Sequence, residues 1–163
     1  MNFIKNITSS GSRPKHNNNN NNNVNELINL DTSNIKQFTL EGFETIAKVS
    51  DVYDGDTCKV VFKYKDEYIK WNCRIMGVDT PELRTRNLKE KECGYFVRDK
   101  VREKMLNKIV KVNCKEFDKY GRLLVDITIN DSNLTEWLIT NKYAYAYGGG
   151  KKEIIEWDIS TLN

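Results

Sequence analysis

Five short segments in which apolar and polar residues alternate place the strongest constraint on how this chain can fold. They cover residues 46–53, 58–64, 68–78, 109–117 and 122–129. Alternation with a period of two is typical of strands that bury one face. Between the first two segments, Asp54-Gly55-Asp56 is a turn signal. The sequence therefore predicts a largely β structure built from short strands.

Two helices are predicted within and after these strands. The first begins at Gly94, where Val97, Val101 and Met105 share one helical face. The second follows Asn133, an N-cap residue with a glutamate three residues later. The segment 83–93 is rich in charge and poor in apolar residues, so we expect a mobile loop. Five antiparallel strands with an inserted helix favour a mainly β (α+β) fold, a five-stranded Greek-key barrel of the OB type with a second helix after the barrel.

Residues 1–43 are predicted to be a disordered, asparagine-rich tail. They contain the unbroken run Asn17–Asn23, and such a segment buries too little apolar surface to offset its ordering entropy. Leu27, Ile28 and Leu30 could form a short docking element, although a solvated linker is the expectation. We assign residues 44–147 to one domain and residues 148–163, which begin with three glycines, to a short C-terminal tail.

Composition leaves the class of partner undecided. The 163 residues carry a formal charge of +3, so positive charge would have to be concentrated locally to attract a polyanion. The four cysteines form no C-x-x-C pair that would indicate zinc, and we expect reduced, structural thiols, although two disulfides are formally possible. No apolar run approaches the ~20 residues of a membrane span, and no signal peptide is recognised, so we expect an intracellular protein.

Three polar motifs carry the candidate chemistry: Asp54-Gly55-Asp56-Thr57, Val78-Asp79-Thr80-Pro81-Glu82 and Asp118-Lys119-Tyr120-Gly121-Arg122. Alone, the first is typical of a hairpin turn and the second of a strand end. Together they supply three carboxylates at neighbouring strand ends, where oxygen ligands can hold a hard cation such as calcium. Arg74 and Arg122 suit phosphate oxygens. The single histidine lies in the asparagine tract, so the motifs point to metal-assisted chemistry on a phosphate ester.

These motifs resemble the staphylococcal (micrococcal) nuclease family, also called thermonucleases. D-G-D-T, the arginine shortly before V-D-T-P-E, and D-K-Y-G-R occur in the family's order and with similar spacing, from Val49 to about Tyr147. The resemblance implies an SNase-like OB-fold endonuclease that uses Ca²⁺ to hydrolyse phosphodiester bonds of DNA and/or RNA. Attack by a metal-bound water would leave 3′-phosphate and 5′-hydroxyl ends.

The resemblance also implies roles for the carboxylate motifs. Asp56 and Asp79 would ligate the metal together with the backbone carbonyl of Thr80. Glu82 would position or deprotonate the attacking water.

Further roles are implied for the basic residues. Arg74 and Arg122 would stabilise the charge of the transition state, and Arg122 could also assist the leaving oxygen. Lys119 and Tyr120 would contact phosphate beside the nucleotide. Tyr145 and Tyr147 are candidates for stacking on the base, with packing at the rim or core as an equal alternative.

An alternative reading is a catalytically weak module of the same family that binds nucleic acid or protein. Binding scaffolds of this kind typically lose the carboxylates or the arginines, whereas this chain keeps both sets, which favours an enzyme. We expect a monomer. The sequence leaves open the choice between DNA and RNA, the biological role and the function of the tail.

Overall fold

The computed structural model describes residues 19–150, 152 and 155–162. The chain divides into two compact units, Met1–Phe38 and Thr39–Asn163, which are considered separately. In the first unit the described residues contain one helix, α1 (Asn19–Ile28). The sequence did not predict this helix, and residues 23–38 are all exposed. Residues 1–18 of the predicted tail lie outside the described residues.

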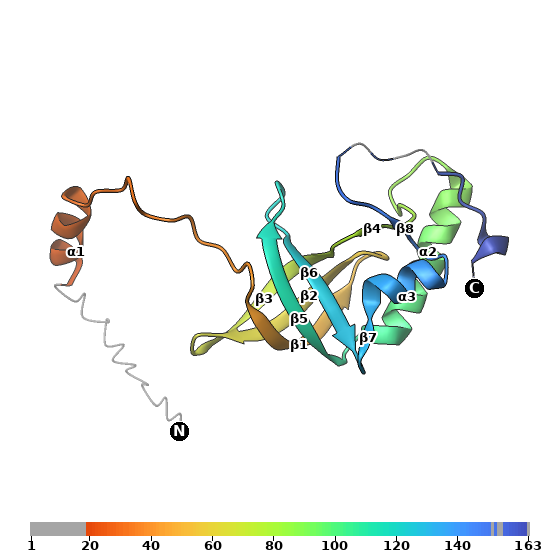
Figure 1. Ribbon diagram of the computed structural model, residues 1–163, viewed down its shortest axis with the longest axis horizontal. Helices are drawn as coiled ribbons and strands as arrows, with labels where there is room; N and C mark the ends of the chain where they lie inside the picture. The colour runs from red at the N-terminus through yellow and green to blue at the C-terminus, as the bar shows by residue number, and fades with distance from the viewer. Residues whose placement is uncertain (1–18, 151, 153–154, 163) are drawn as a thin grey trace, which may run out of the picture. The chain divides into compact units, whose positions relative to one another are not determined.

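The second unit is built around a closed barrel of five strands (Figure 1). Antiparallel neighbours follow the order β3-β2-β1-β5-β6, and β3 also pairs with β6, which closes the barrel. This closing pair is parallel, so the expectation of purely antiparallel strands was wrong for one pair. The OB-type α+β barrel itself is confirmed. Its strands are β1 (Glu44–Val52), β2 (Thr57–Tyr64), β3 (Glu67–Ile75), β5 (Ile109–Phe117) and β6 (Leu123–Ile129).

The barrel interior is filled by the inward-facing residue at every second strand position. In β6 alternate residues from Leu123 to Ile129 are buried and those between them are half-buried. Because side chains alternate across a strand, Cys73 and Ile75 of β3 point into this core while Arg74 and Met76 do not. All four cysteines are buried and unpaired. Burial raises the pKa of the Cys73 thiol to about 12, so it stays neutral and packs as a small apolar group.

The helix α2 (Leu88–Met105) begins six residues before the predicted start at Gly94. Asn87 caps it, because its side-chain oxygen accepts from the backbone N–H groups of Lys89 and Glu90 at 3.1 and 3.3 Å. The prediction of a loop over residues 83–93 was therefore wrong for its second half. Gly94 is instead a packing position: an added Cβ would lie 3.0 Å from the carbonyl oxygen of Pro81.

The predicted third strand also ends earlier than expected. It stops at Ile75, and Gly77 adopts a positive φ of 82° before the two-residue strand β4 (Val78–Asp79). β4 leaves the barrel and pairs with β8 (Tyr145–Ala146). This separate pairing carries the V-D-T-P-E motif away from the barrel wall.

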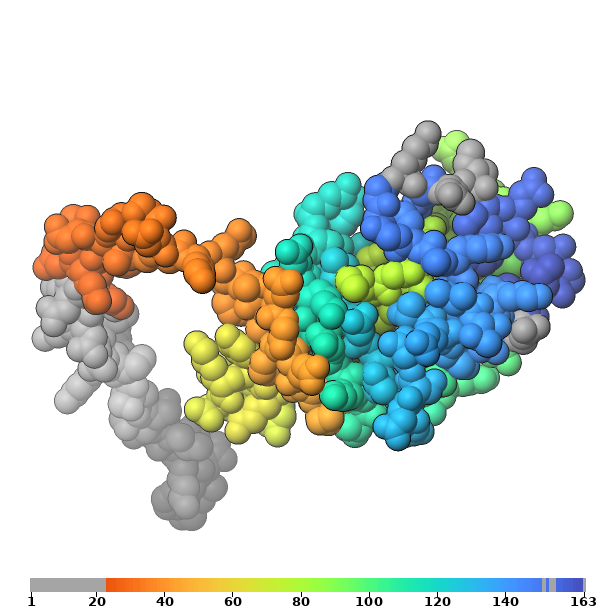
Figure 2. Space-filling view, in the orientation of Figure 1, coloured from red at the N-terminus to blue at the C-terminus, as the bar shows by residue number. Residues whose placement is uncertain are grey.

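The remaining elements cover the end of the barrel near α2. β7 (Ser132–Asn133) leads into α3 (Leu134–Thr140), which Asn133 caps as predicted. Figure 2 shows β5 and β6, in green-blue to cyan, beside α3 and the residues after it, in blue. A short 3₁₀ helix, η1 (Ile159–Thr161), contacts α2. Among the described residues no helix is both long enough and apolar enough to cross a membrane.

A tight turn between β1 and β2 depends on the absence of a side chain at Gly55. An added Cβ would lie 2.8 Å from Thr80 Cβ and 2.8 Å from Val97 Cγ1, so Gly55→Ala should lower the free energy of unfolding by about 1–3 kcal/mol. Gly148→Ala is the control, because no described atom lies within 4 Å of the added Cβ. Urea unfolding measures both variants. Equal midpoints for the two would contradict this account of the turn.

Candidate active site

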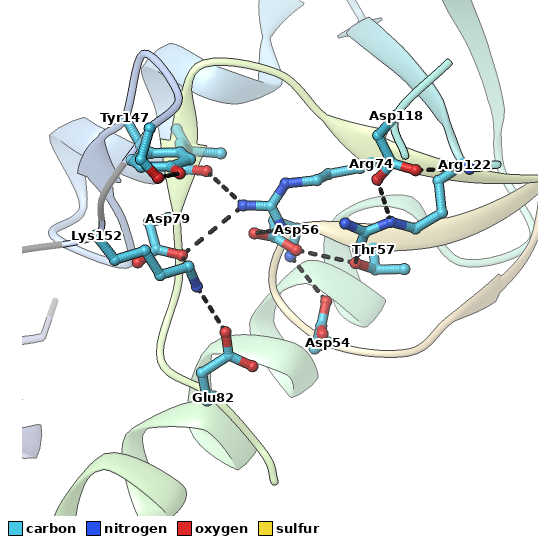
Figure 3. A network of polar contacts seen from close by, with 12 residues as sticks. Asp54, Asp56, Thr57, Arg74, Asp79, Glu82, Asp118, Arg122, Tyr147 and Lys152 are labelled. Carbon is cyan, nitrogen blue, oxygen red and sulfur yellow. Dashed lines mark hydrogen bonds and ion pairs between the residues drawn. The ribbon is translucent and has the colours of Figure 1, made fainter. Parts of the chain in front are cut away.

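A pocket of about 380 Å³ gathers residues from all three polar motifs. Seven of the eight site residues predicted from the sequence line it, and the eighth, Asp79, is joined to it through ion pairs (Figure 3). The seven are Asp56, Arg74, Thr80, Glu82, Lys119, Tyr120 and Arg122.

The turn between β1 and β2 directs the Asp56 side chain into this pocket. Its N–H donates to Asp54 Oδ1 at 3.2 Å, and its carbonyl accepts from the N–H of Ile75 at 2.8 Å. Because β2 and β3 pair Thr57 with Arg74, the Arg74 guanidinium reaches back to Asp56. Arg74 Nη1 lies 2.6 Å from Asp56 Oδ2, and Asp56 is only 3% exposed. The result is a nearly buried ion pair at the pocket floor.

The Asp56 carboxyl is short of positive charge despite this ion pair. Burial raises its pKa from 3.8 to about 7, and the neighbouring charge of Asp54 acts in the same direction. The Arg74 guanidinium and a hydrogen bond from Thr57 oppose the rise. Burial outweighs them because removing a carboxylate from water disfavours its charged form. A second cation beside Asp56 would lower this pKa.

Asp79 and Glu82 are bridged by a lysine that the sequence motifs do not include. Lys152 Nζ lies 2.6 Å from Asp79 Oδ1 and 2.6 Å from Glu82 Oε1 (Figure 3). Burial alone would lower the pKa of this amine, but the two carboxylates outweigh it and raise the pKa. Arg74 Nη2 approaches Asp79 more loosely, at 3.8 Å, while donating to the carbonyl of Val78 at 3.2 Å.

Arg122 is held in place by Asp118, the first residue of its own motif. Asp118 Oδ1 accepts from the N–H groups of Tyr120 and Arg122, both at 2.9 Å, and Oδ2 accepts from Arg122 Nε at 2.7 Å. Gly121 has a positive φ of 77°, which lets the chain turn this tightly. Burial would raise the pKa of the Asp118 carboxyl, but these hydrogen bonds lower it below its ordinary value. The carboxylate therefore stays charged and fixes the guanidinium.

A chain of contacts joins Arg122 to the Asp56 floor. Arg122 Nη1 donates to Thr57 Oγ1 at 3.4 Å, and the same hydroxyl donates to Asp56 Oδ1 at 2.9 Å. Arg122 and Arg74 thus approach the same carboxylate from two sides, one through a hydroxyl and one directly. Both guanidinium groups line the one pocket. This arrangement can grip the oxygens of a single phosphate group.

The aromatic residues at the rim differ in how free their rings are. Tyr120 is 72% exposed, with Lys119 and Arg122 over its ring at 5.1 and 5.6 Å. Tyr147 lines the pocket, and its hydroxyl donates to the carbonyl of Gly150 at 2.7 Å. Tyr145 packs edge-on against Trp157 with ring centroids 4.8 Å apart. Tyr145 therefore already has a packing partner, whereas Tyr120 presents a ring to solvent.

The oxygen donors here fit a hard cation by their chemistry. Asp56, Asp79 and the carbonyl of Thr80 are the ligand types that calcium takes. In the described part of the chain the buried Oδ1 of Asp79 is contacted by two cations, Lys152 at 2.6 Å and Arg74 at 3.8 Å. Among the described residues no three acidic, cysteine or histidine side chains are grouped as a metal cluster. A cation bound by both Asp79 and Glu82 would have to displace Lys152.

Sequence reasoning missed Asp118 and Lys152. The role of Asp118 could have been predicted, because an aspartate side chain commonly closes a turn by accepting a hydrogen bond from the backbone N–H two residues later. The role of Lys152 could not have been predicted, since this residue follows three glycines and its partners lie about seventy residues earlier.

Comparison with known proteins identifies the family. The family model for staphylococcal nuclease homologues matches residues 72–156, slightly more than half of the chain. The chain belongs to the staphylococcal nuclease family. The matched residues include Arg74, Asp79, Glu82 and Arg122, while Asp56 lies before them.

A relative from an archaeon was also found. The uncharacterized protein MJ1439 of Methanocaldococcus jannaschii is 34% identical, over 61% of this chain and 58% of that protein. The chain thus spans less than two thirds of the relative's length.

Lys152 competes for the carboxylates that a metal would use, and removing its charge should strengthen calcium binding. Lys152→Met keeps a side chain of similar length without the amine. Removing one positive charge ~4 Å from the ion is worth at least about 1 kcal/mol, or roughly fivefold in affinity. Calorimetric titration with calcium measures this, and Lys119→Met, which removes a pocket cation without an acidic partner among the described residues, is the matched control. An unchanged or lower affinity in Lys152→Met would show that Lys152 does not compete.

Proposed function

We propose that this protein is a calcium-dependent endonuclease that hydrolyses phosphodiester bonds of DNA or RNA, leaving 3′-phosphate and 5′-hydroxyl ends. The observation that carries the proposal is the convergence of two arginines on one buried carboxylate. Arg74 contacts Asp56 at 2.6 Å and Arg122 reaches it through Thr57. Membership of the nuclease family supports the same conclusion.

The two arginines are suited to the charge that builds on phosphorus during attack. As a phosphodiester becomes five-coordinate, negative charge grows on its non-bridging oxygens, and donors fixed in advance stabilise it most. Arg122 is fixed by Asp118, and Arg74 by Asp56 and the carbonyl of Val78. Neither guanidinium has to reorganise when the phosphate enters, so both donate to its oxygens at little entropic cost.

Glu82 takes a proton in the proposed reaction. It is half exposed at the pocket rim, and its carboxylate projects from the segment after Pro81. In the proposed reaction a water oxygen forms a bond to phosphorus and gives its proton to Glu82, while the bond from phosphorus to the 5′-oxygen breaks. Arg122 donates a hydrogen bond to the leaving 5′-oxygen, which takes its proton from solvent. Lys152 must first release Glu82.

Asp56, Asp79 and the carbonyl of Thr80 would hold calcium. When bound, the ion supplies positive charge beside the phosphate and the attacking water. Without the ion, burial raises the pKa of Asp56 to about 7. A bound cation would stabilise the charged carboxylate.

A second candidate is a nucleic-acid-binding module with weak or no catalysis. It is favoured by one observation: Arg74 and Lys152 already form ion pairs with the carboxylates that a metal would use. In such a module the pocket would bind phosphate through its basic residues without turning it over.

A cleavage assay separates the two candidates. Single-stranded DNA, duplex DNA and RNA are incubated with calcium, with magnesium or with excess chelator. Calcium should raise the rate by about 10²-fold or more, because it supplies several kcal/mol of charge stabilisation. Glu82→Gln purified in the same way controls for contaminating nuclease. Equal turnover in chelator would contradict metal dependence, and binding without cleavage in any metal would support the module.

Glu82 and Asp56 should respond in opposite ways when their charge is removed. Glu82→Gln keeps the shape but loses the basic oxygen, so hydrolysis should slow by at least the ~10²-fold expected of a general base while calcium affinity changes little. Asp56→Asn should weaken calcium binding directly. Calorimetry and single-turnover rates on both variants test this. Loss of calcium binding in Glu82→Gln, with normal binding in Asp56→Asn, would reverse the two roles.

A further inference from the structure

We propose that a second groove, beside α2, binds an unpaired stretch of the same nucleic-acid strand that enters the candidate active site. The inference rests on the proposed function only in assuming that the strand in the groove is the one that also enters the candidate active site. The groove has a volume of about 520 Å³. We call it the arginine–tyrosine groove and define it by six of its lining residues: Tyr53, Arg84, Lys91, Tyr95, Arg98 and Arg102.

One face of α2 provides most of this groove. Lys91, Tyr95, Arg98 and Arg102 recur at spacings of four, three and four residues, so they form a single stripe along the helix. The adjoining face of the helix packs in the core through Cys93, Gly94, Val97, Val101 and Met105. The helix therefore presents a basic and aromatic edge, half-buried except at Tyr95, beside its core-facing side.

The groove is continuous with the candidate active site. A smaller pocket of about 350 Å³ lies between them and shares lining residues with both. It shares Tyr53 and Arg84 with the arginine–tyrosine groove. It shares Glu82 and Arg122 with the candidate active site. A strand whose phosphate lies between the arginines of the site can therefore continue past Arg84 onto α2.

The charges in the groove favour a polyanion. Four basic side chains line it against one acidic side chain, Asp51. Arg102 approaches Asp51 at 3.9 Å, and Arg98 pairs with its neighbour Asp99 at 2.8 Å. Among the ion pairs of the described residues, none involves Arg84 or Lys91. These two cations can contact phosphates without first breaking an ion pair.

The aromatic rings favour an unpaired strand over a duplex. Tyr53 and Tyr95 are 44% and 43% exposed. Each is covered on one side by an arginine, with Arg84 at 5.6 Å from the Tyr53 ring and Arg98 at 4.8 Å from the Tyr95 ring. Exposed tyrosine rings and arginine side chains provide stacking surfaces for bases, and stacking needs bases that are not already paired.

Binding measured in excess chelator tests the groove without cleavage. The variant is Arg84→Gln/Arg98→Gln. The control is Lys65→Gln/Lys70→Gln, which removes two charges from the β2–β3 hairpin, at the end of the barrel away from α2 in Figure 1. The probes are labelled single strands of about 12 nucleotides, within the ~4–16 that one OB-fold covers, and of about three nucleotides, below it.

The groove variant should bind the longer strand about tenfold more weakly than the control does. The slope of log affinity against log salt concentration should be shallower by roughly 1.4 in the groove variant. Each single-strand phosphate that the variant no longer neutralises accounts for about 0.7 of this. On the short strand its affinity should fall no further than that of the control. Equal losses of affinity for the two variants on the longer strand would overturn the proposal. An equal loss of affinity on both strand lengths would also overturn it, because the arginines would then act in the catalytic pocket. Full displacement of the strand by polyglutamate would overturn it too, because the groove would then be a general anion-binding surface.

The result is independent of the cleavage assay. A protein that cleaves, with no difference between the groove variant and the control, refutes the groove alone. A protein that cleaves nothing, yet loses affinity for the longer strand in the groove variant, keeps the groove and refutes the nuclease.

Discussion

The parallel pairing of β3 with β6 is the constraint on which the site depends. It sets Cys73, Arg74 and Ile75 opposite Leu123, Leu124 and Val125. Because the buried residues of this pair must face the core, the register is fixed, and a slip of one residue would turn every side chain to the wrong face. Arg122 directly precedes the paired segment, so closing the barrel also brings the two arginines to the same end.

Charge balance in the pocket follows from this geometry. A carboxylate that is 3% exposed is costly to ionise unless cations stand close to it. Arg74 contacts this carboxylate directly, and Arg122 reaches it through Thr57. Lys152 forms ion pairs with Asp79 and Glu82. The arginines come from the barrel itself. Lys152 comes from the segment after the glycines, so the cation on the outer carboxylates is the one that can leave without disturbing the barrel.

Sequence patterns that span a few residues predicted the barrel strands and the start of α3. The alternation of residues identified all five barrel strands, and Asn133 with Glu136 marked the start of α3, because strand periodicity and capping act over a few residues. The start of α2 was missed because its first turn is charged and exposed, which removes the apolar signal, although Asn87 was a readable cap.

Long-range features were beyond such patterns. The parallel closure joins strands about fifty residues apart, and the contact of Lys152 with Glu82 spans 70. No periodicity encodes either one. The motifs located the pocket residues because turns hold each motif rigidly. Which cation meets which carboxylate depends on packing between the motifs.

The weak net charge of the chain illustrates the same limit. A formal charge of +3 over 163 residues gives little attraction for a polyanion. Salt screens charges beyond about 8–10 Å, so a phosphate responds to the side chains around it and not to the total. Four α2 residues that line the groove, three of them basic and one a tyrosine, lie on one side of the helix. Acidic Asp99, which pairs with Arg98, does not line the groove. Helical spacing thus converts a nearly neutral sequence into a locally basic surface, and only a structure, or a helix start placed correctly at Leu88, reveals it.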